Sequence, residues 1–288
     1  MRTLSDQRGL RLRGRTRVHV RTHARAPGGR HMKPRIAVFS LTSCEGCSLA
    51  ILELEDQLLE ILGAVDIVNF REGMTERSWD IDVAFVDGAV STPHDEEEIR
   101  RIRERCRTLV AIGACACLGG VNTLKHDPAR PDYRCVVYGD RADWFPTTRA
   151  RPLSAVVKVD AELPGCPMVK EEFLELVRCL LNGRQFRLPP NPVCTECKKL
   201  GNPCLYERGE FCLGPLTRAG CRAICPSFGS VCEACRGLVD GEALRAGREV
   251  FNTQYVVPWE EVVARLRLYG AVCENAEPVA APAAGGGS

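Results

Sequence analysis

The chain has 288 residues, of which 45% are hydrophobic and 26% are charged, and its formal net charge is +2. This composition argues against a disordered chain and predicts a globular protein with one sizeable core and a smaller second unit. No apolar run reaches the length that a membrane-spanning helix needs, so we expect a soluble protein.

Residues 1–31 form a strongly basic segment. They contain nine Arg and one acidic residue, a local charge of 9 − 1 = +8, so the rest of the chain nets 2 − 8 = −6. The segment lacks the apolar centre of a secretory signal and the adjacent Arg pair of a twin-arginine signal. A nucleic-acid or membrane arm is an alternative, but we expect a disordered extension and neither nucleic acid nor membrane as a partner.

Strands and helices alternate through the first half of the chain. Short apolar runs predict strands at residues 35–40, 66–70, 81–87, 109–113 and 156–160. Apolar periodicity predicts helices at residues 48–62, 95–106 and 169–182. Strands that alternate with helices are typical of a parallel sheet with helices on both faces. We therefore predict an α/β fold, with a flavodoxin-like, doubly wound parallel sheet domain.

Four cysteines follow predicted strands. Cys44 and Cys47 come after the first strand, Cys115 after the strand that ends at residue 113, and Cys166 after the last strand. Open α/β sheets form their ligand crevice at the carboxyl ends of the strands, so we expect the four thiols to converge there. Four thiolates at one crevice are typical of an iron-sulfur cluster. A phosphate-binding FMN site at the turn 40–46 is an alternative, but it leaves these cysteines unexplained.

Eight further cysteines crowd into residues 194–235, and this run begins and ends with a Cys-x-x-Cys pair. They are Cys194, Cys197, Cys204, Cys212, Cys221, Cys225, Cys232 and Cys235. Two tetrathiolate metal centres would use all eight, although spacing alone leaves open the metal and the division into fours. The total of 17 cysteines is odd and no export signal is evident, which favours metal ligation in a reducing cytoplasm over disulfides.

Three ordered motifs carry a family resemblance. They are Thr42-Ser-Cys-Glu-Gly-Cys, Ile112-Gly-Ala-Cys-Ala-Cys-Leu-Gly-Gly and Leu163-Pro-Gly-Cys-Pro. Together they resemble the small, electron-transferring subunit of nickel-iron hydrogenases. The later cysteine run is most similar to cytosolic sulfhydrogenase delta subunits and F420-non-reducing hydrogenase small subunits. The similarity runs from about residue 33 to residue 237.

The resemblance implies three 4Fe-4S clusters. It implies a proximal cluster, nearest the nickel-iron site, on Cys44, Cys47, Cys115 and Cys166. It implies a distal cluster on Cys194, Cys197, Cys204 and Cys212, and a medial one on Cys221, Cys225, Cys232 and Cys235. Many periplasmic relatives have a histidine in place of Cys194 and only three cysteines at the medial cluster. The extra thiolates here favour three 4Fe-4S clusters of less positive potential. Division of the last eight cysteines in chain order is the simplest choice, and other divisions stay open.

Five cysteines fall outside these sets: Cys106, Cys117, Cys135, Cys179 and Cys273. Cys106 and Cys179 lie on predicted amphipathic helices, and we expect both to be core thiols. Cys117 is close enough to Cys115 in sequence to be mistaken for the ligand. The match to the family's Gly-x-Cys pattern implies Cys115 instead.

The resemblance also implies the role of the chain. It would be an oxidoreductase subunit, catalytic only within a hydrogenase complex, that relays electrons between the nickel-iron site of the large subunit and a redox partner. That partner would be an NAD(P)-reducing, flavin and iron-sulfur subunit of the diaphorase type, or another electron-transfer subunit. The chain itself lacks the paired Cys-x-x-Cys motifs and terminal histidine of the large subunit, so we expect no nickel ligand and no catalytic residue.

Two other classes of protein are alternatives. The cluster-bearing subunit of an NADH:quinone oxidoreductase-like complex would share the N-terminal fold. It typically has adjacent cysteines in the first motif and no two-cluster extension, whereas Cys44 and Cys47 are separated here. A zinc-binding interaction module would use Cys-x-x-Cys pairs, but it would give the first four cysteines no purpose.

These expectations divide the chain into five parts. A basic extension (1–31) precedes the flavodoxin-like domain (32–188) and a small, irregular two-cluster domain (189–240). A helical segment (241–275) and a flexible tail (276–288) follow. The predicted helix at residues 258–269 carries Trp259, Val262 and Leu266, which we expect to pack on the chain's own core, with docking to a partner as the alternative.

Overall fold

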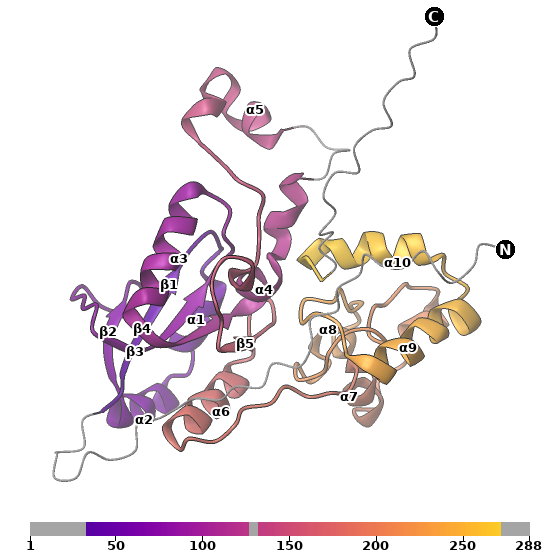
Figure 1. Cartoon of the computed structure of the whole chain (residues 1–288). Coiled ribbons are helices and arrows are strands. Elements are labelled where there is room, and N and C mark those ends of the chain that lie inside the picture. Colours follow the sequence, from indigo (N-terminus) through magenta and orange to yellow (C-terminus); the bar gives the residue numbers. More distant parts are fainter. Residues whose placement is uncertain (1–32, 127–131, 272–288) are drawn as a thin grey trace, which may run out of the picture.

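The computed structural model describes residues 33–126 and 132–271. The expected disorder of the basic extension and of the tail, and also Cys273, lie outside these residues. Figure 1 shows a sheet with its helices, in indigo through magenta to the salmon of α6, beside a second part of short helices and loops in salmon to yellow. Within the described ranges, no helix is both long and apolar enough to cross a membrane.

Five parallel strands form the sheet, in the order β2-β1-β3-β4-β5. The strands are β1 (Arg35–Ser40), β2 (Asp66–Phe70), β3 (Ile81–Asp87), β4 (Cys106–Ile112) and β5 (Ala161–Leu163). This order is the flavodoxin-like one, in which the strand order reverses between β1 and β3. The predicted fold class is confirmed.

Two predicted strands have different bounds. The fourth begins at Cys106 rather than at residue 109, because Cys106 already has extended backbone angles and pairs with Ile81 of β3. The fifth was predicted at residues 156–160 and occupies Ala161–Leu163 instead. The amides of Val156 and Val157 bond back to Leu153 in a tight turn, so they are not available to a strand neighbour. The apolar character of these valines reflects packing at the sheet, not strand pairing.

The helix predicted at residues 48–62 is two helices, α1 (Gly46–Leu52) and α2 (Asp56–Ala64). The break lies at Glu55, whose φ of +50° is incompatible with a continuous α-helix. The buried side chain of Leu54 packs into the core at this turn. Apolar periodicity continues through the break, which is why the sequence pattern does not show it.

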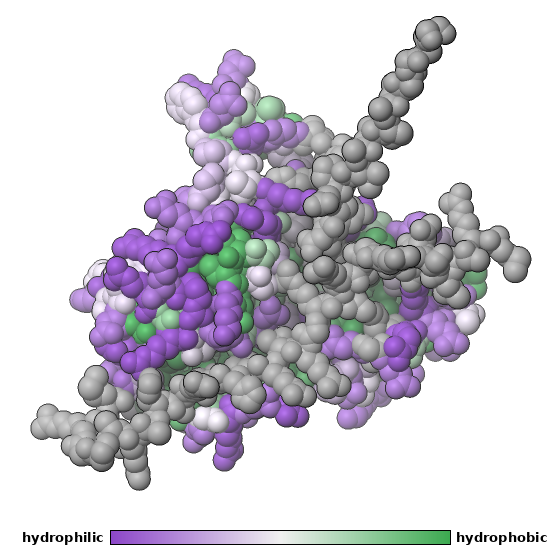
Figure 2. Space-filling model, in the orientation of Figure 1, coloured by the Kyte–Doolittle hydropathy of each residue, from purple (hydrophilic) through white to green (hydrophobic). Residues whose placement is uncertain are grey.

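Helices cover both faces of the sheet. On one face α1 and α6 (Lys170–Leu181) pack against the strands, and Phe173 of α6 contacts Phe85 of β3. On the other face α3 (Pro93–Arg105) and α4 (Gly113–Leu118) pack against strand residues that alternate with the first set. Because successive strand side chains point to opposite faces, β3 supplies Phe85 to one core and Ala84 to the other. In Figure 2 the left-hand part, which holds the sheet, shows many hydrophilic residues around a hydrophobic stretch.

The remaining elements are short. Those of the sheet part are η1 (Gly120–His126), α5 (Tyr133–Tyr138), η2 (Gly139–Trp144) and η3 (Leu153–Ala155). Those of the second part are α7 (Val193–Lys199), η4 (Leu205–Arg208), α8 (Ile224–Ser227), α9 (Gly241–Val250), η5 (Phe251–Tyr255), α10 (Trp259–Leu266) and η6 (Arg267–Tyr269). Val262 and Leu266 of α10 are fully buried against Leu213 and Leu216 of the cysteine-rich region, residues 189–240. The predicted C-terminal helix therefore packs on its own chain.

Arg236 joins the two parts of the molecule. Its side chain is 1% exposed and pairs with Glu172 of α6 at 2.9 Å. Its Nε donates to the carbonyl oxygen of Ala219 and its Nη1 to that of Pro164, each at 2.9 Å. Because Pro164 directly follows β5 and Ala219 belongs to the cysteine-rich region, one guanidinium fixes that region against the edge of the sheet.

Candidate metal centres

The four sheet-edge cysteines lie together at the carboxyl ends of the strands. Cys44 lies two residues before α1, Cys47 is in its first turn, Cys115 is on α4, and Cys166 is in the loop between β5 and α6. Burial raises the pKa of Cys115 to about 12, and the nearby charges of Asp87, Cys166 and Cys44 contribute to that rise. Burial, Asp87, Cys115 and Cys166 likewise raise the pKa of Cys47. Cys115 therefore lies near Cys44, Cys47 and Cys166.

Backbone and side-chain donors surround these sulfurs. The amide of Met168 donates to Cys47 Sγ at 3.5 Å, and Asn122 Nδ2 donates to Cys115 Sγ at 3.7 Å. Two glycines with positive φ make room for the sulfurs: a Cβ at Gly113 would collide with Cys47 Sγ, and one at Gly120 would lie 2.6 Å from Cys115 Sγ. Four convergent thiols with hydrogen-bond donors and close backbone fit the donor set of an iron-sulfur cluster.

Asp87 is a buried carboxyl at the end of β3 beside this set. Burial raises its pKa to about 6, although the amides of Gly88, Cys47 and Ser48 donate to it and lower the pKa. Its Oδ2 has no hydrogen-bond partner among the described residues. Asp87 was not predicted as a site residue, and its only signal in the sequence is an acidic residue directly after the apolar run from Val83 to Val86.

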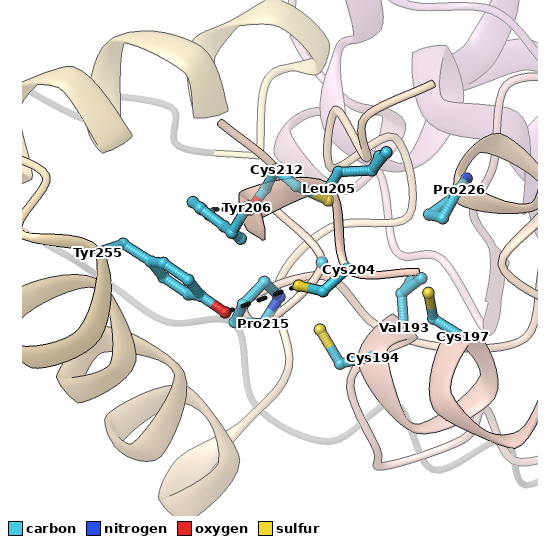
Figure 3. A pocket seen from close by; sticks show the side chains of 11 residues that line it. Val193, Cys194, Cys197, Cys204, Leu205, Tyr206, Cys212, Pro215, Pro226 and Tyr255 are labelled. Atoms are coloured by element: carbon cyan, nitrogen blue, oxygen red, sulfur yellow. Dashed lines mark hydrogen bonds between the residues drawn. The ribbon is translucent and has the colours of Figure 1, made fainter. Parts of the chain in front are cut away.

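A second set of four lies in the cysteine-rich region. Cys194 and Cys197 are one turn apart on α7, Cys204 precedes η4, and Cys212 follows in a loop. Burial raises the pKa of Cys194 to about 12, with added effects of Cys212, Cys197 and Cys204. Figure 3 shows the four side chains at one pocket, which Val193, Leu205, Tyr206, Pro215, Pro226 and Tyr255 also line.

The remaining four cysteines lie between these two sets. Burial raises the pKa of Cys235 to about 11, the backbone of Cys166 lowers it through a hydrogen bond, and the charges of Cys221, Cys225 and Cys166 raise it. Burial also raises the pKa of Cys232, with added effects of Cys212 and Cys235. The amide of Cys232 donates to Cys212 Sγ at 3.3 Å. One side of this set therefore faces Cys166, and the other faces Cys212.

The other four described cysteines belong to none of the three sets. Cys106, Cys117 and Cys179 are buried in the two sheet cores, whereas Cys135 is exposed on α5. Cys117 is 1% exposed, and its thiol donates to the carbonyl oxygen of Ala111 at 3.4 Å. All 16 cysteines in the described part of the chain are free of disulfide bonds. No three or more His, Cys, Asp or Glu side chains there are arranged around a point so as to hold a single metal ion.

Several polar residues at these sites were missed by sequence analysis. Asn122 and Asn202 donate to Cys115 and Cys197, and Tyr255 contacts Cys204. None belongs to a recognisable motif, because each reaches its sulfur through tertiary packing. In the sequence, only the short spacings from Cys115 to Asn122 and from Cys197 to Asn202 could have pointed to the two asparagines.

The chain is similar to subunits of known oxidoreductases. A family model described as "NADH ubiquinone oxidoreductase, 20 Kd subunit" matches residues 44–180. Sulfhydrogenase 2 subunit delta of Pyrococcus furiosus is 36% identical over 237 residues, which cover 82% of this chain and 98% of that protein. The F420-non-reducing hydrogenase of Methanococcus voltae has a vhu subunit that is 32% identical over 252 residues, which cover 77% of this chain and 88% of that protein.

A solved structure shares the fold. A chain of the actinobacterial-type NiFe-hydrogenase from Ralstonia eutropha H16 superposes with a TM-score of 0.52, covering 81% of this chain and 90% of that one. The sequence identity is 14%, so this likeness concerns the fold alone.

Proposed function

Because the chain belongs to the hydrogenase small-subunit family of which the Pyrococcus and Methanococcus proteins are members, we propose that it relays electrons through three 4Fe-4S clusters. As a subunit of a hydrogenase it is an oxidoreductase component that works within a complex. We also propose the number of clusters, the ligands of each cluster and the partners at the two ends of the series.

The ligand sets are the three groups of thiols. Cys44, Cys47, Cys115 and Cys166 would hold the proximal cluster, Cys221, Cys225, Cys232 and Cys235 the medial one, and Cys194, Cys197, Cys204 and Cys212 the distal one. The observation that carries the proposal is the continuity between the groups: Cys166 neighbours Cys235, and Cys232 neighbours Cys212. Three sites in one uninterrupted series suit electron transfer, which needs closely spaced centres.

Several residues of this chain would stabilise negative charge on the thiolate ligands. A bound 4Fe-4S cluster supplies one-electron oxidation and reduction. Amides and amide side chains donate to sulfurs in the proximal and distal groups and stabilise thiolates there. Arg236 lowers the pKa of Cys221, although burial raises it overall. Burial of Cys47, Cys212 and Cys232 excludes water from the sulfurs that face inward.

The exposure of two proximal cysteines supports a binding position for the large subunit. Cys44 and Cys166 are exposed at the sheet edge, where we propose that a nickel-iron large subunit covers the proximal group. The distal group would then face a second partner, an NAD(P)-reducing, diaphorase-type subunit or another electron-transfer subunit. We further propose a cytoplasmic location, where a reducing environment keeps thiols available as ligands.

A second candidate is the cluster-bearing subunit of an NADH:quinone oxidoreductase-like complex, which the description of the matching family model favours. That model ends at residue 180, before the eight cysteines of the later run. The two candidates differ in their partners. Copurification with a nickel-containing subunit would support the hydrogenase, and copurification with quinone-reducing membrane subunits would support the alternative.

Metal analysis of the intact complex tests the clusters. The full chain should contribute roughly twelve iron and twelve acid-labile sulfide, four of each per cluster. Replacement of Cys235 by Ala should remove or convert one cluster and lower the iron content by up to about four per chain. The matched control is Cys179→Ser, a buried thiol of α6 outside the three groups, which should retain all the iron. A zinc-loaded chain without an EPR signal on reduction would contradict the proposal.

A further inference from the structure

Two stacked tyrosines close one side of the pocket at Cys194, Cys197, Cys204 and Cys212 (Figure 3). Tyr206 belongs to η4 of the cysteine-rich region, and Tyr255 ends η5 of the C-terminal segment. Their ring centroids are 3.3 Å apart and their planes differ by 13°. Phe251 packs edge-on against both rings, at centroid distances of 6.0 Å and 6.2 Å. The rings are therefore held in place from two sides.

The two hydroxyl groups have different partners. Tyr206 donates to the main-chain carbonyl oxygen of Cys212 at 2.6 Å. Tyr255 Oη lies 3.9 Å from Cys204 Sγ, in hydrogen-bonding contact. A free thiol and a hydroxyl could each be the donor in this second pair. Once Cys204 is a thiolate ligand, its sulfur has no proton, so the tyrosine hydroxyl must donate.

We propose that Tyr255 is a positioning residue whose hydroxyl donates to Cys204 Sγ and raises the reduction potential of the centre held by Cys194, Cys197, Cys204 and Cys212. This inference rests on the proposed function. Reduction adds one negative charge, part of which resides on the cysteine sulfurs. A hydrogen bond to a charged acceptor is stronger than one to a neutral group, so the donor stabilises the reduced form more than the oxidised form.

Tyr255 belongs to the C-terminal segment, which brings its hydroxyl to the cysteine-rich region. The C-terminal segment lies outside the run of cysteines, yet it packs on that run through Phe251, Val262 and Leu266. It thereby delivers a hydroxyl to the group farthest from the sheet. A higher potential at that outer group favours electron transfer away from the sheet edge. The C-terminal segment would thus set the reduction potential of the centre from which electrons leave the chain.

The test is a redox titration of the intact complex, monitored by EPR, with Tyr255→Phe and Tyr206→Phe compared with the wild type. Both variants keep an aromatic ring in the stack, and only Tyr255→Phe removes a donor from a sulfur. In Tyr255→Phe, one of three one-electron components should move to lower potential. A roughly tenfold change in its ratio of oxidised to reduced form at fixed potential corresponds to about 59 mV. Tyr206→Phe should leave all three components in place.

Two further measurements separate the possible failures. The component that moves should be the one that Cys194→Ala removes or converts, and the iron content of Tyr255→Phe should equal that of the wild type. If the wild type lacks three components, the proposed function fails. If all three are present and none moves in Tyr255→Phe, only the role of Tyr255 fails. Equal shifts in both tyrosine variants would assign the effect to ring packing and would overturn the inference.

Discussion

Replacement of Arg236 by Met should loosen the cysteine-rich region from the sheet. The arginine side chain is 1% exposed and that of its partner Glu172 is 16% exposed, so water screens the pair weakly. Methionine fills a similar volume but leaves the Glu172 carboxylate and the carbonyl oxygens of Ala219 and Pro164 without this donor. The perturbation thus removes one cation from a site with three acceptors.

The cost follows from the unpaired charge. Removal of one partner of a buried ion pair costs about 3–5 kcal/mol, because the remaining charge stays buried. The double variant Arg236→Met/Glu172→Met should recover most of this loss, since an apolar pair can replace a buried ion pair at little net cost. Arg236→Lys should lie between the wild type and Arg236→Met, because an ammonium group keeps the charge but cannot match the planar fork of the guanidinium.

Native-state hydrogen exchange of the intact complex measures this local opening. At 1.36 kcal/mol per factor of ten, the cost corresponds to an increase of roughly two to four orders of magnitude in the opening equilibrium of amides near residues 219–237. Amides of β1 and β3 should change little. A loss below about 1 kcal/mol, the range of exposed ion pairs, would refute the reasoning. So would a double variant that is less stable than Arg236→Met.

The remaining predictions concern other parts of the fold. Gly113→Ala should lose the proposed proximal cluster, measured by iron content and EPR. The added Cβ would collide with Cys47 Sγ, and alanine is strained at a φ of +83°. Gly63→Ala, on α2 with nothing within 4 Å of the added Cβ, should keep the cluster and stabilise the chain by about 0.5–1 kcal/mol. Thr92→Ala should cost about 1 kcal/mol in thermal or chemical denaturation, because Thr92 and Asp95 form the capping box of α3, and unchanged stability would contradict this. Chelation of the iron should raise hydrogen exchange in residues 189–240 while β1, β3 and β4 stay protected, because ligation supplies folding energy where apolar burial is small; uniform loss of protection would contradict that expectation.

The sheet could be predicted from sequence because its signals are local. Residues 81–87 and 109–112 are dense apolar runs that end at turns, and the order of the elements then fixes parallel pairing. Parallel pairing in turn brings Cys44, Cys115 and Cys166 to one edge without knowledge of any contact. The errors are also local in origin: the turn at Glu55 and the three-residue β5 depend on backbone angles that hydrophobic periodicity does not encode.

The residues that support the sites could not be predicted in this way. Tyr255 reaches Cys204 only because Phe251 and α10 pack on the cysteine-rich region, and Arg236 pairs with Glu172 from 64 positions away. Such contacts depend on how two distant segments dock. A single sequence carries no local pattern for that docking, so these residues became visible only in the folded chain.

The position of Arg236 also explains why the last cysteines of the run lie in the middle of the series. After β5 and α6 the chain first reaches the outer group at α7, and it then returns toward the sheet. Arg236 directly follows Cys235 and binds the carbonyl oxygen of Pro164, two residues before Cys166. This anchor sets Cys235 beside Cys166, while the bond from the Cys232 amide to Cys212 Sγ holds the other end of the same group. Spatial order therefore departs from chain order because one buried cation holds the end of the run at the strand edge. A change at that cation should disturb the proposed medial centre before the proposed distal one.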